Sequence, residues 1–480
     1  MSKKIWKGCQ NLMDSVKKNF IYDAVYQILI LIIPFLTTPY IARIIGVDGV
    51  GIYSYTYSIV NYFMMFALLG MNNYGNREIS KCKDDKIELS KTFWEIYTLQ
   101  FLITLIVTIL YVGYIYFFSP KYLLITLIQG IYLISVFLDI NWLFCGLQEF
   151  KITITRSAFI KILTLILIFT FVKDEGDLWK YILIMSSMTL LNQLVLWPFL
   201  RKKISFVKIN IKNIKRHIKP TIILFIPVIA TSIFKVMDKI MIGNISSVTE
   251  VGYYENSEKM LNIILSVVSA LGTVTLPQMT YLYNNNKIDE YKKIFSKSIS
   301  FLIFIVLPVI AGFLVTSNDL VYLYLGESFQ KSSIILKILS ISLLFSPIAS
   351  IIRMQVLIPQ SRDKQYIISV IAGATINFIL NLFLIPYIQS IGAAISTVLA
   401  EGVVFFIEIY YIRNEFTIVK DIKNIFRFFI SSLYVFFFAS LIGIFVDNII
   451  IRLLLQIIVG LLSYIIGNLQ YIKTIIKSRG

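Results

Sequence analysis

Long apolar stretches alternate with short polar segments along the whole chain. Each stretch has roughly 20 residues or more, the length that a helix needs to cross the hydrocarbon core of a bilayer. An even number of such helices places both chain ends on the same side of the membrane. The pattern predicts an all-α, polytopic fold with fourteen membrane-spanning helices, at residues 21–43, 50–70, 92–118, 122–145, 152–172, 178–200, 220–243, 250–277, 297–316, 332–357, 365–386, 390–412, 424–446 and 449–472.

The composition agrees with a membrane protein. Of the 480 residues 57% are apolar and 15% are charged, whereas a soluble protein carries about 25% charged residues. These values exclude a soluble enzyme and a disordered or disulfide-rich secreted protein. The apolar run that starts at Ile21 is too long for a signal peptide and no cleavage site follows it, so we expect an uncleaved first span.

The net charge of +18 reports the orientation of the chain in the membrane. With the N-terminus inside, 33 of the 45 lysines and arginines fall in the inside segments, 7 in the outside connections and 5 within spans. Cytoplasmic loops carry an excess of basic residues. We therefore expect a multi-pass protein of the cell (plasma) membrane with both termini in the cytoplasm. We expect no nucleic-acid partner, because the charge is accounted for by orientation.

Rare residue types restrict the chemistry. The chain has one histidine and three cysteines without a C-x-x-C spacing, and it has no P-loop motif. We expect no metal site and no cofactor, and an ion gradient or the membrane potential as the energy source. No outside connection exceeds about 16 residues, so the sequence offers no extracytoplasmic catalytic domain and predicts a protein that is not an enzyme.

The two halves of the sequence resemble one another. Val50, Gly51 and Tyr53 recur as Val251, Gly252 and Tyr254, at an offset of 201 residues. Two parallel repeats around a cleft form a transporter architecture, in which one half rocks against the other; chance similarity between apolar helices is the alternative. The expected organisation is an N-lobe at 1–200, a basic cytoplasmic linker at 201–219, a C-lobe at 220–412, and two further helices with a tail at 413–480.

Charged residues within the predicted spans are the candidates for function. A charged side chain in a span costs a few kcal/mol, so it usually faces a cavity or a partner. Two interpretations of the densest group remain open: a polar lumen that holds an anion on its lysines, or neutralised pairs that only join two helices. Spacings of three and four residues allow pairs within each helix. The group contains Lys235, Asp238, Lys239, Glu255, Glu258 and Lys259.

Other charged residues are more isolated. Arg353 has no acidic residue near it in the sequence, which favours it as an anion ligand. Arg43 closes the first span, where it binds an anion or anchors the helix at the interface. Asp139, on the same predicted helix face as Trp142, and Glu401 are candidates for carrying a coupling proton, although for each residue taken singly a buried interhelical hydrogen bond is the favoured explanation.

Motifs in order along nearly the whole chain resemble bacterial oligosaccharide flippases of the Wzx type, and most closely the members from Gram-positive capsule loci. These transporters belong to the multidrug/oligosaccharidyl-lipid/polysaccharide (MOP) exporter superfamily. The segments that carry the resemblance are Pro39–Gly46, Gly51–Thr56, Tyr74–Ile79, Asp139–Trp142, Gly146–Lys151, Met237–Gly243, Glu250–Tyr254, Gln355–Pro359, Asn377 with Asn381, and Ile391–Ala394 with Glu401.

The resemblance implies two six-helix lobes in a pseudo-twofold arrangement plus two C-terminal helices. It implies as substrate an undecaprenyl-diphosphate that carries an oligosaccharide repeat unit and is moved to the outer leaflet. Membrane lipids, a polysaccharide polymerase and other assembly proteins are the implied partners. The resemblance also implies that basic residues line the lumen, and the matching candidates are Arg43, Lys235, Lys239, Lys259 and Arg353.

Three other functions compete with this expectation. A flippase for lipid II of peptidoglycan shares the cationic lumen. A MATE-type ion-coupled drug exporter has the same fold but favours a cavity dominated by carboxylates, whereas this chain has both signs. A membrane polymerase or ligase needs a large outside loop, which the sequence lacks.

Overall fold

The computed structural model describes the backbone of residues 2–118, 121–207, 211–416 and 422–477. Side-chain surroundings are described from Ile32 onward, apart from short stretches that include 233–235 and 267–271. Close contacts divide the chain into an N-terminal unit, residues 1–229, and a C-terminal unit, residues 230–480. The boundary between the units falls inside a helix and not in the predicted linker. The organisation into two six-helix lobes stays a prediction.

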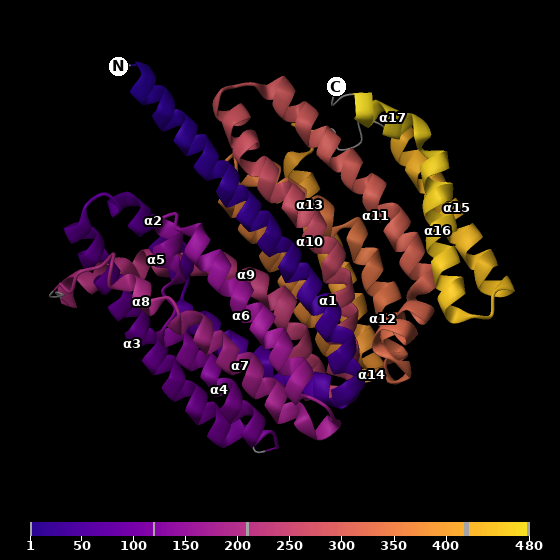
Figure 1. Ribbon diagram of the computed structural model, residues 1–480. Coiled ribbons are helices and arrows are strands. Elements are labelled where there is room, and N and C mark those ends of the chain that lie inside the picture. The colour runs from indigo at the N-terminus through magenta and orange to yellow at the C-terminus, as the bar shows by residue number, and fades with distance from the viewer. Residues whose placement is uncertain (1, 119–120, 208–210, 417–421, 478–480) are drawn as a thin grey trace. The chain divides into compact units, whose positions relative to one another are not determined.

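The N-terminal unit is helical throughout its described regular structure (Figure 1). Its 3₁₀ turn η1 covers Glu175–Asp177, and it contains the first part of α9, Ile211–Ile245. The other helices are α1 (Ser2–Leu68), α2 (Met71–Cys82), α3 (Lys86–Phe118), α4 (Leu123–Phe137), α5 (Asn141–Gly146), α6 (Phe150–Phe171), α7 (Leu178–Leu194) and α8 (Trp197–Leu200).

The C-terminal unit contains the rest of α9, and its described regular elements are again helical or tightly wound. One of them is a π-helical turn, η4 (Arg353–Leu357). The others are α10 (Val248–Asn284), α11 (Ile288–Leu325), η2 (Glu327–Phe329), α12 (Lys331–Ser340), η3 (Ile341–Leu344), α13 (Ser346–Ile352), α14 (Asp363–Ile412), α15 (Ile422–Phe445), α16 (Ile449–Gly467) and α17 (Leu469–Lys477).

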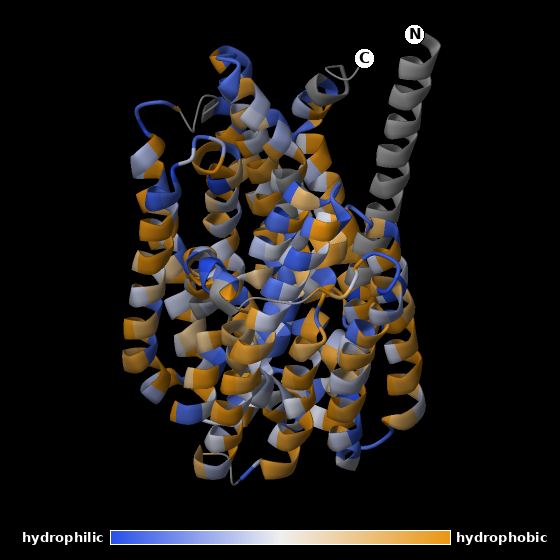
Figure 2. Ribbon diagram, turned by 90° about the vertical axis from the view of Figure 1, so that its left-hand side faces the viewer, coloured by the Kyte–Doolittle hydropathy of each residue, from blue (hydrophilic) through white to orange (hydrophobic). Residues whose placement is uncertain are grey.

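Every apolar stretch of the sequence falls within these helices, which confirms an all-α polytopic membrane fold. Figure 2 shows apolar residues along much of the length of the long helices, whereas the connections are largely polar. Nine described segments are long and apolar enough to cross a membrane: Lys86–Phe118, Leu123–Gly146, Phe150–Phe171, Glu175–Leu200, Ile288–Leu325, Lys331–Leu357, Asp363–Ile412, Lys423–Phe445 and Ile449–Gly467. The remaining predicted spans lie in α1, α9 and α10. The total of fourteen spans for the whole chain stays a prediction.

Two long helices each contain two predicted spans joined by a kink. In α1 the kink lies at Gly46, whose φ of 68° is readily adopted only by glycine. In α14 it lies at Ile388 and Gln389, and Gln389 has a φ of 54°. The corresponding break in the second half of the sequence is the short connection from α9 to α10. The interval from Gly243 to Val251 is four residues longer than the interval from Gly46 to Val50 in α1.

One predicted span, 122–145, is interrupted near its end. Helix α4 ends at Phe137 and α5 begins at Asn141. The buried side chain of Gln100 on α3 donates to the carbonyl oxygens of Val136 and Asp139, at 2.8 and 2.9 Å. The carbonyl of Val136 also accepts from the backbone N–H of Asp139, at 3.2 Å, so the side chain of Gln100 joins α3 to both ends of the break. The prediction that Asp139 and Trp142 share the face of one continuous helix was wrong, because α4 ends before Asp139.

Helix α2 lies in a segment to which the sequence pattern assigned no element. It packs closely on α5: a Cβ atom added at Gly75 would lie 2.5 Å from the ring of Trp142, and one added at Gly146 would lie 2.6 Å from Ile79. Trp142 is buried in a hydrophobic cluster with Phe93 on α3. Glycine at both positions therefore permits the contact between α2 and α5, which fixes the end of the N-terminal unit where α9 begins.

Candidate functional site

Helices α9 and α10 bring four of the predicted charged residues into one cluster, which we call the lysine–glutamate cluster. Lys239 on α9 contacts two carboxylates of α10: its Nζ lies 2.5 Å from Glu255 Oε2 and 2.9 Å from Glu258 Oε2. The other oxygen of Glu255 lies 3.1 Å from Lys259 Nζ. This last contact confirms the pair predicted from the four-residue spacing, and Glu255 bridges the two lysines.

The cluster has no formal net charge, and its exposure is graded. The side chain of Lys259 is 37% exposed and that of Lys239 is 15% exposed. Lys259 is therefore the more accessible of the two lysines. Neutralising the lysines by carboxylates reduces the cost of holding them between apolar helices.

Asp238 faces a different set of partners from its neighbour Lys239. It is buried, and it accepts hydrogen bonds from Tyr254, Thr397 and Asn381 at 2.7, 2.7 and 2.6 Å. Three uncharged donors thus hold this carboxylate. The predicted pairing with Lys235 concerns a side chain that lies outside the described residues.

Arg353 has a partner that the sequence analysis did not foresee. Its guanidinium donates to Glu408 Oε1 at 3.2 Å, and the Glu408 side chain is fully buried. Ser369 donates to the same carboxylate oxygen at 2.9 Å. The expectation of an unpaired arginine was therefore wrong, because the partner lies 55 residues further along the chain.

The turn that carries Arg353 is itself irregular. Residues Arg353–Leu357 form a π-helical turn between α13 and the loop before α14. Such turns are rare and frequently occur at functional sites. Glu401 interacts electrostatically with Arg353, so this arginine faces two acidic residues of α14.

A polar stripe along the second half of α14 connects these charged groups. Its members follow one helix face at spacings of seven, four and seven residues, and they are Ser390, Thr397, Glu401 and Glu408. Thr397 contacts Asp238, and the two acidic residues face Arg353. In the first half of the helix, before the kink, Asn381 donates to Asp238 and Ser369 donates to Glu408. The kink at Gln389 thus lets both halves of α14 contact one row of charges.

Glu250 is a further buried charge of this row, and the sequence analysis did not select it. Ser390 donates to its carboxylate through the hydroxyl and through the backbone N–H, the latter at 3.3 Å. Lys331 Nζ lies 2.6 Å from Glu250 Oε1 and 2.7 Å from Gln389 Oε1. Glu250 and Lys331 therefore hold the kink of α14. The sequence analysis placed Lys331 in an outside connection, whereas the structure has it as the first residue of α12.

The two candidates in the N-terminal unit lie outside this row of charges. Arg43 is exposed on α1, three residues before the kink at Gly46. Asp139 is buried at the break between α4 and α5, where it accepts a hydrogen bond from the backbone N–H of Asn141 at 2.9 Å. This contact between residues i and i+2 is that of an Asx turn before α5.

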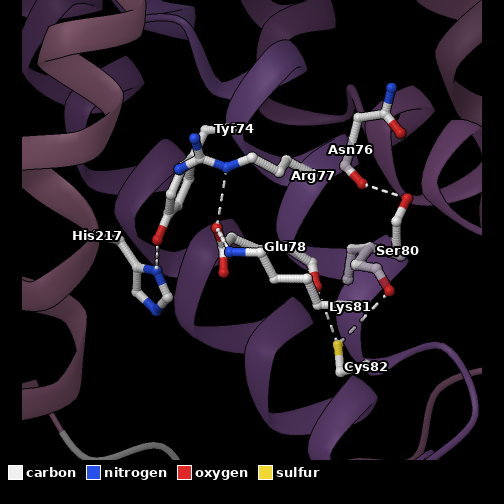
Figure 3. A network of polar contacts seen from close by, with 9 residues as sticks. Tyr74, Asn76, Arg77, Glu78, Ser80, Lys81, Cys82 and His217 are labelled. Carbon is white, nitrogen blue, oxygen red and sulfur yellow. Dashed lines mark hydrogen bonds and ion pairs between the residues drawn. The ribbon is translucent and has the colours of Figure 1, made fainter. Parts of the chain in front are cut away.

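The N-terminal unit has its own polar network, centred on the only histidine. His217 on α9 lies 3.0 Å from Glu95 on α3 through Nε2 and 2.6 Å from the hydroxyl of Tyr74 on α2 through Nδ1. Figure 3 shows the contact between Tyr74 and His217 beside the ion pairs of α2. Arg216 also donates to the fully buried Glu95, at 2.6 Å. This network ties the predicted cytoplasmic linker to α2 and α3.

Acid is expected to weaken this network. Burial, with help from the charge of Arg216, lowers the pKa of His217 below its usual value, and the hydrogen bond to Glu95 opposes this only in part. Below a pH of about 6.5, His217 therefore binds a proton in the unfolded chain but resists it in the folded chain. The free energy of unfolding decreases as the pH decreases. Thermal unfolding of the purified protein should show a melting temperature that decreases from pH 7.5 to pH 5.5.

The matched variant is His217→Gln, which keeps a donor for Glu95 but does not titrate. Its melting temperature should change less over the same pH range than that of the wild type. Equal pH dependence in the two proteins would show that His217 is not the responsible group.

Ionisable residues inside membrane-spanning helices usually face a cavity or a partner and mark a functional site. The overall fold can be compared with that of solved membrane proteins. The structure matches that of "Lipid II flippase MurJ, inward closed conformation" with a TM-score of 0.78, at 18% identity, over 95% of this chain and 99% of that chain. At this identity the likeness shows the fold. The fold thus defines a multi-pass membrane protein.

A family model described as "Polysaccharide biosynthesis protein" matches residues 16–282, more than half of the chain. The chain belongs to this family; it is a flippase-type membrane transporter and not an enzyme. It is 23% identical over 84% of its length, and 97% of the relative's, to an Escherichia coli (strain K12) protein named as an O-antigen transporter. It is 24% identical, over 83% of its length and all of the relative's, to "Capsular polysaccharide biosynthesis protein CapF" of Staphylococcus aureus.

Proposed function

We propose that this protein moves undecaprenyl-diphosphate-linked oligosaccharide repeat units from the cytoplasmic to the outer leaflet, for the synthesis of capsular or other surface polysaccharide. The family supports a role in polysaccharide biosynthesis, and two relatives named for O-antigen transport and capsule synthesis support a glycan as cargo. The observation that carries the proposal is the lysine–glutamate cluster, which offers cations to a diphosphate inside a membrane-spanning unit.

The diphosphate binds by exchanging partners with the cluster. Lys259, the more exposed lysine, meets it first, and Lys239 follows as Glu255 and Glu258 release it. Charge-assisted hydrogen bonds to phosphate oxygens replace those to the carboxylates, so no lysine is left unpaired at any stage. Binding by exchange remains reversible, which a transporter needs in order to release its cargo on the other side.

The remaining basic candidates extend the path of the diphosphate. Arg353 exchanges Glu408 for phosphate in the same way, and Glu401 stabilises the arginine when the site is empty. Lys235 and Arg43 complete the cationic lumen in this proposal. Alternating access results from rocking of an N-lobe, residues 1–200, against a C-lobe, residues 220–412, while the polyprenyl tail stays in lipid.

Transport is driven by an ion gradient or the membrane potential, and Asp238 is the coupling carboxylate that we favour. Its three uncharged donors leave the carboxylate free to exchange one of them for a cation, because no described lysine or arginine neutralises it. Asp139 is less suited to this role, since its carboxylate takes part in the turn between α4 and α5. The protein acts in the plasma membrane with both termini in the cytoplasm, beside a polymerase and other assembly proteins.

Deletion of the gene from the bacterial host tests the substrate class. We expect lipid-linked repeat units to accumulate and surface polysaccharide to disappear, while peptidoglycan synthesis continues; expression of the wild-type chain should reverse both effects. Arrest of peptidoglycan synthesis would instead identify a lipid II flippase. Normal polysaccharide together with increased sensitivity to cationic drugs would identify a drug exporter.

A further inference from the structure

A pocket of about 410 Å³ opens in the N-terminal unit, and its lining includes none of the charged residues discussed so far. It lies between the turn from α5 to α6 and the segment after α8. Three of its residues are lysines and two are phenylalanines with 38% and 39% of their surface exposed. The lining consists of Gln148, Glu149, Phe150, Lys151, Ile152, Phe199, Lys202 and Lys203.

The pocket lies at the level of lipid headgroups. Its two walls are the ends of two segments that are long and apolar enough to span the membrane, Phe150–Phe171 and Glu175–Leu200. Residues at the end of a span lie at the boundary between hydrocarbon and water. The distribution of basic residues predicts that this boundary is the cytoplasmic one, where the leaflet is rich in anionic lipids.

Two of the three lysines are available to an anion. Lys203 forms an ion pair with Glu149, so their charges offset each other. Lys151 and Lys202 are exposed, and within the described part of the chain neither has a carboxylate partner. The pocket therefore presents two positive charges beside two exposed aromatic rings.

An exposed stripe on α6 continues from the pocket into the membrane. It begins with Lys151 and proceeds at spacings of four, four, three and four residues through Thr155, Phe159, Ile162 and Ile166. The three apolar members are 65%, 42% and 54% exposed. A positive pocket at the headgroup level thus adjoins an apolar surface of the length of an acyl chain.

We propose that this pocket binds the phosphate headgroup of an anionic phospholipid of the cytoplasmic leaflet, with an acyl chain along the α6 stripe. Lys151 and Lys202 contact the phosphate, and Phe150 and Phe199 contact the glycerol and upper acyl region. The volume is near the lower end of the roughly 300–1,000 Å³ of ligand pockets. It accommodates a headgroup, whereas a diphosphate with several sugars requires more space. The proposal does not rest on the proposed function.

Lipid binding to the full-length purified protein tests this inference. Native mass spectrometry measures the retention of phosphatidylglycerol and of zwitterionic phosphatidylcholine, and we expect the wild type to prefer phosphatidylglycerol. Near an anionic surface each lysine contributes about fivefold in affinity. Lys151→Ala combined with Lys202→Ala should therefore weaken phosphatidylglycerol binding about 30-fold, and high salt should reduce the difference.

Two further variants make the test specific. Lys83→Ala combined with Lys86→Ala removes the same charge from exposed positions, one just after α2 and one at the start of α3, and it should leave the lipid preference unchanged. Glu149→Gln frees Lys203 and should strengthen phosphatidylglycerol binding. Equal binding by the wild type and the pocket variant overturns the proposal. Binding of undecaprenyl diphosphate but not of phosphatidylglycerol overturns it as well, because the pocket then belongs to the transported lipid.

Discussion

Replacement of Arg353 by methionine is expected to lower the free energy of unfolding by about 3–5 kcal/mol, the usual cost of removing one partner of a buried ion pair. The reason is the position of Glu408: its side chain is fully buried, and without Arg353 it keeps only the hydrogen bond from Ser369. Denaturation of the purified protein, followed by circular dichroism at several denaturant concentrations, measures this loss.

A second variant separates the stability of the protein from its transport activity. Arg353→Met together with Glu408→Gln removes both charges, so most of the lost stability should return. Transport should stay impaired, because the arginine that exchanges its carboxylate for phosphate is still missing. Recovery of transport in this double variant would show that Arg353 serves only to join α14 to the π-helical turn.

Replacement of Lys239 by glutamine is expected to reduce transport of the lipid-linked oligosaccharide at least tenfold. Lys239 is the cation that both Glu255 and Glu258 contact, and without it the cluster carries a net negative charge that repels a diphosphate. A loss of about 1.4 kcal/mol in binding already corresponds to tenfold. The rate at which the lipid moves between the leaflets of proteoliposomes, measured with protein that is shown to be folded and inserted, reports the effect.

Two matched variants accompany this substitution. Lys337→Gln removes a lysine of α12 that donates to the uncharged Asn318 and has no carboxylate partner among the described residues, and transport should remain near the wild-type rate. Lys239→Arg keeps the charge and should retain much of the activity. Wild-type transport by Lys239→Gln would contradict a role for the lysine–glutamate cluster in binding the diphosphate.

The helices of this protein could be predicted from the sequence because each span requires a long apolar stretch. The interruptions could not be predicted so well. The break after Phe137 depends on Gln100 of another helix, whose side chain donates to the carbonyl groups of Val136 and Asp139. The kink at Gln389 depends on Glu250 and Lys331, which hold the adjoining backbone and side chain. Such contacts arise only in the folded chain.

The candidate site was predictable to the extent that its contacts are local. The pair of Glu255 with Lys259 follows from a helical spacing. The pairs of Lys239 with Glu255 and of Arg353 with Glu408 join different helices, and hydropathy gives no information on which helices meet. One signal was present but not used: the spacing of Ser390, Thr397 and Glu408 places them on one face of α14.

The most direct test of the proposed function is a leaflet-resolved assay on the purified full-length protein in liposomes. The substrate is undecaprenyl-diphosphate carrying the repeat unit of the host's own polysaccharide, and a membrane-impermeant reagent detects the sugars on one face. We predict movement across the bilayer that depends on the protein, that an imposed ion gradient or membrane potential accelerates, and that Lys239→Gln suppresses. Movement of lipid II in place of this substrate, or movement unaffected by Lys239→Gln, would contradict the account.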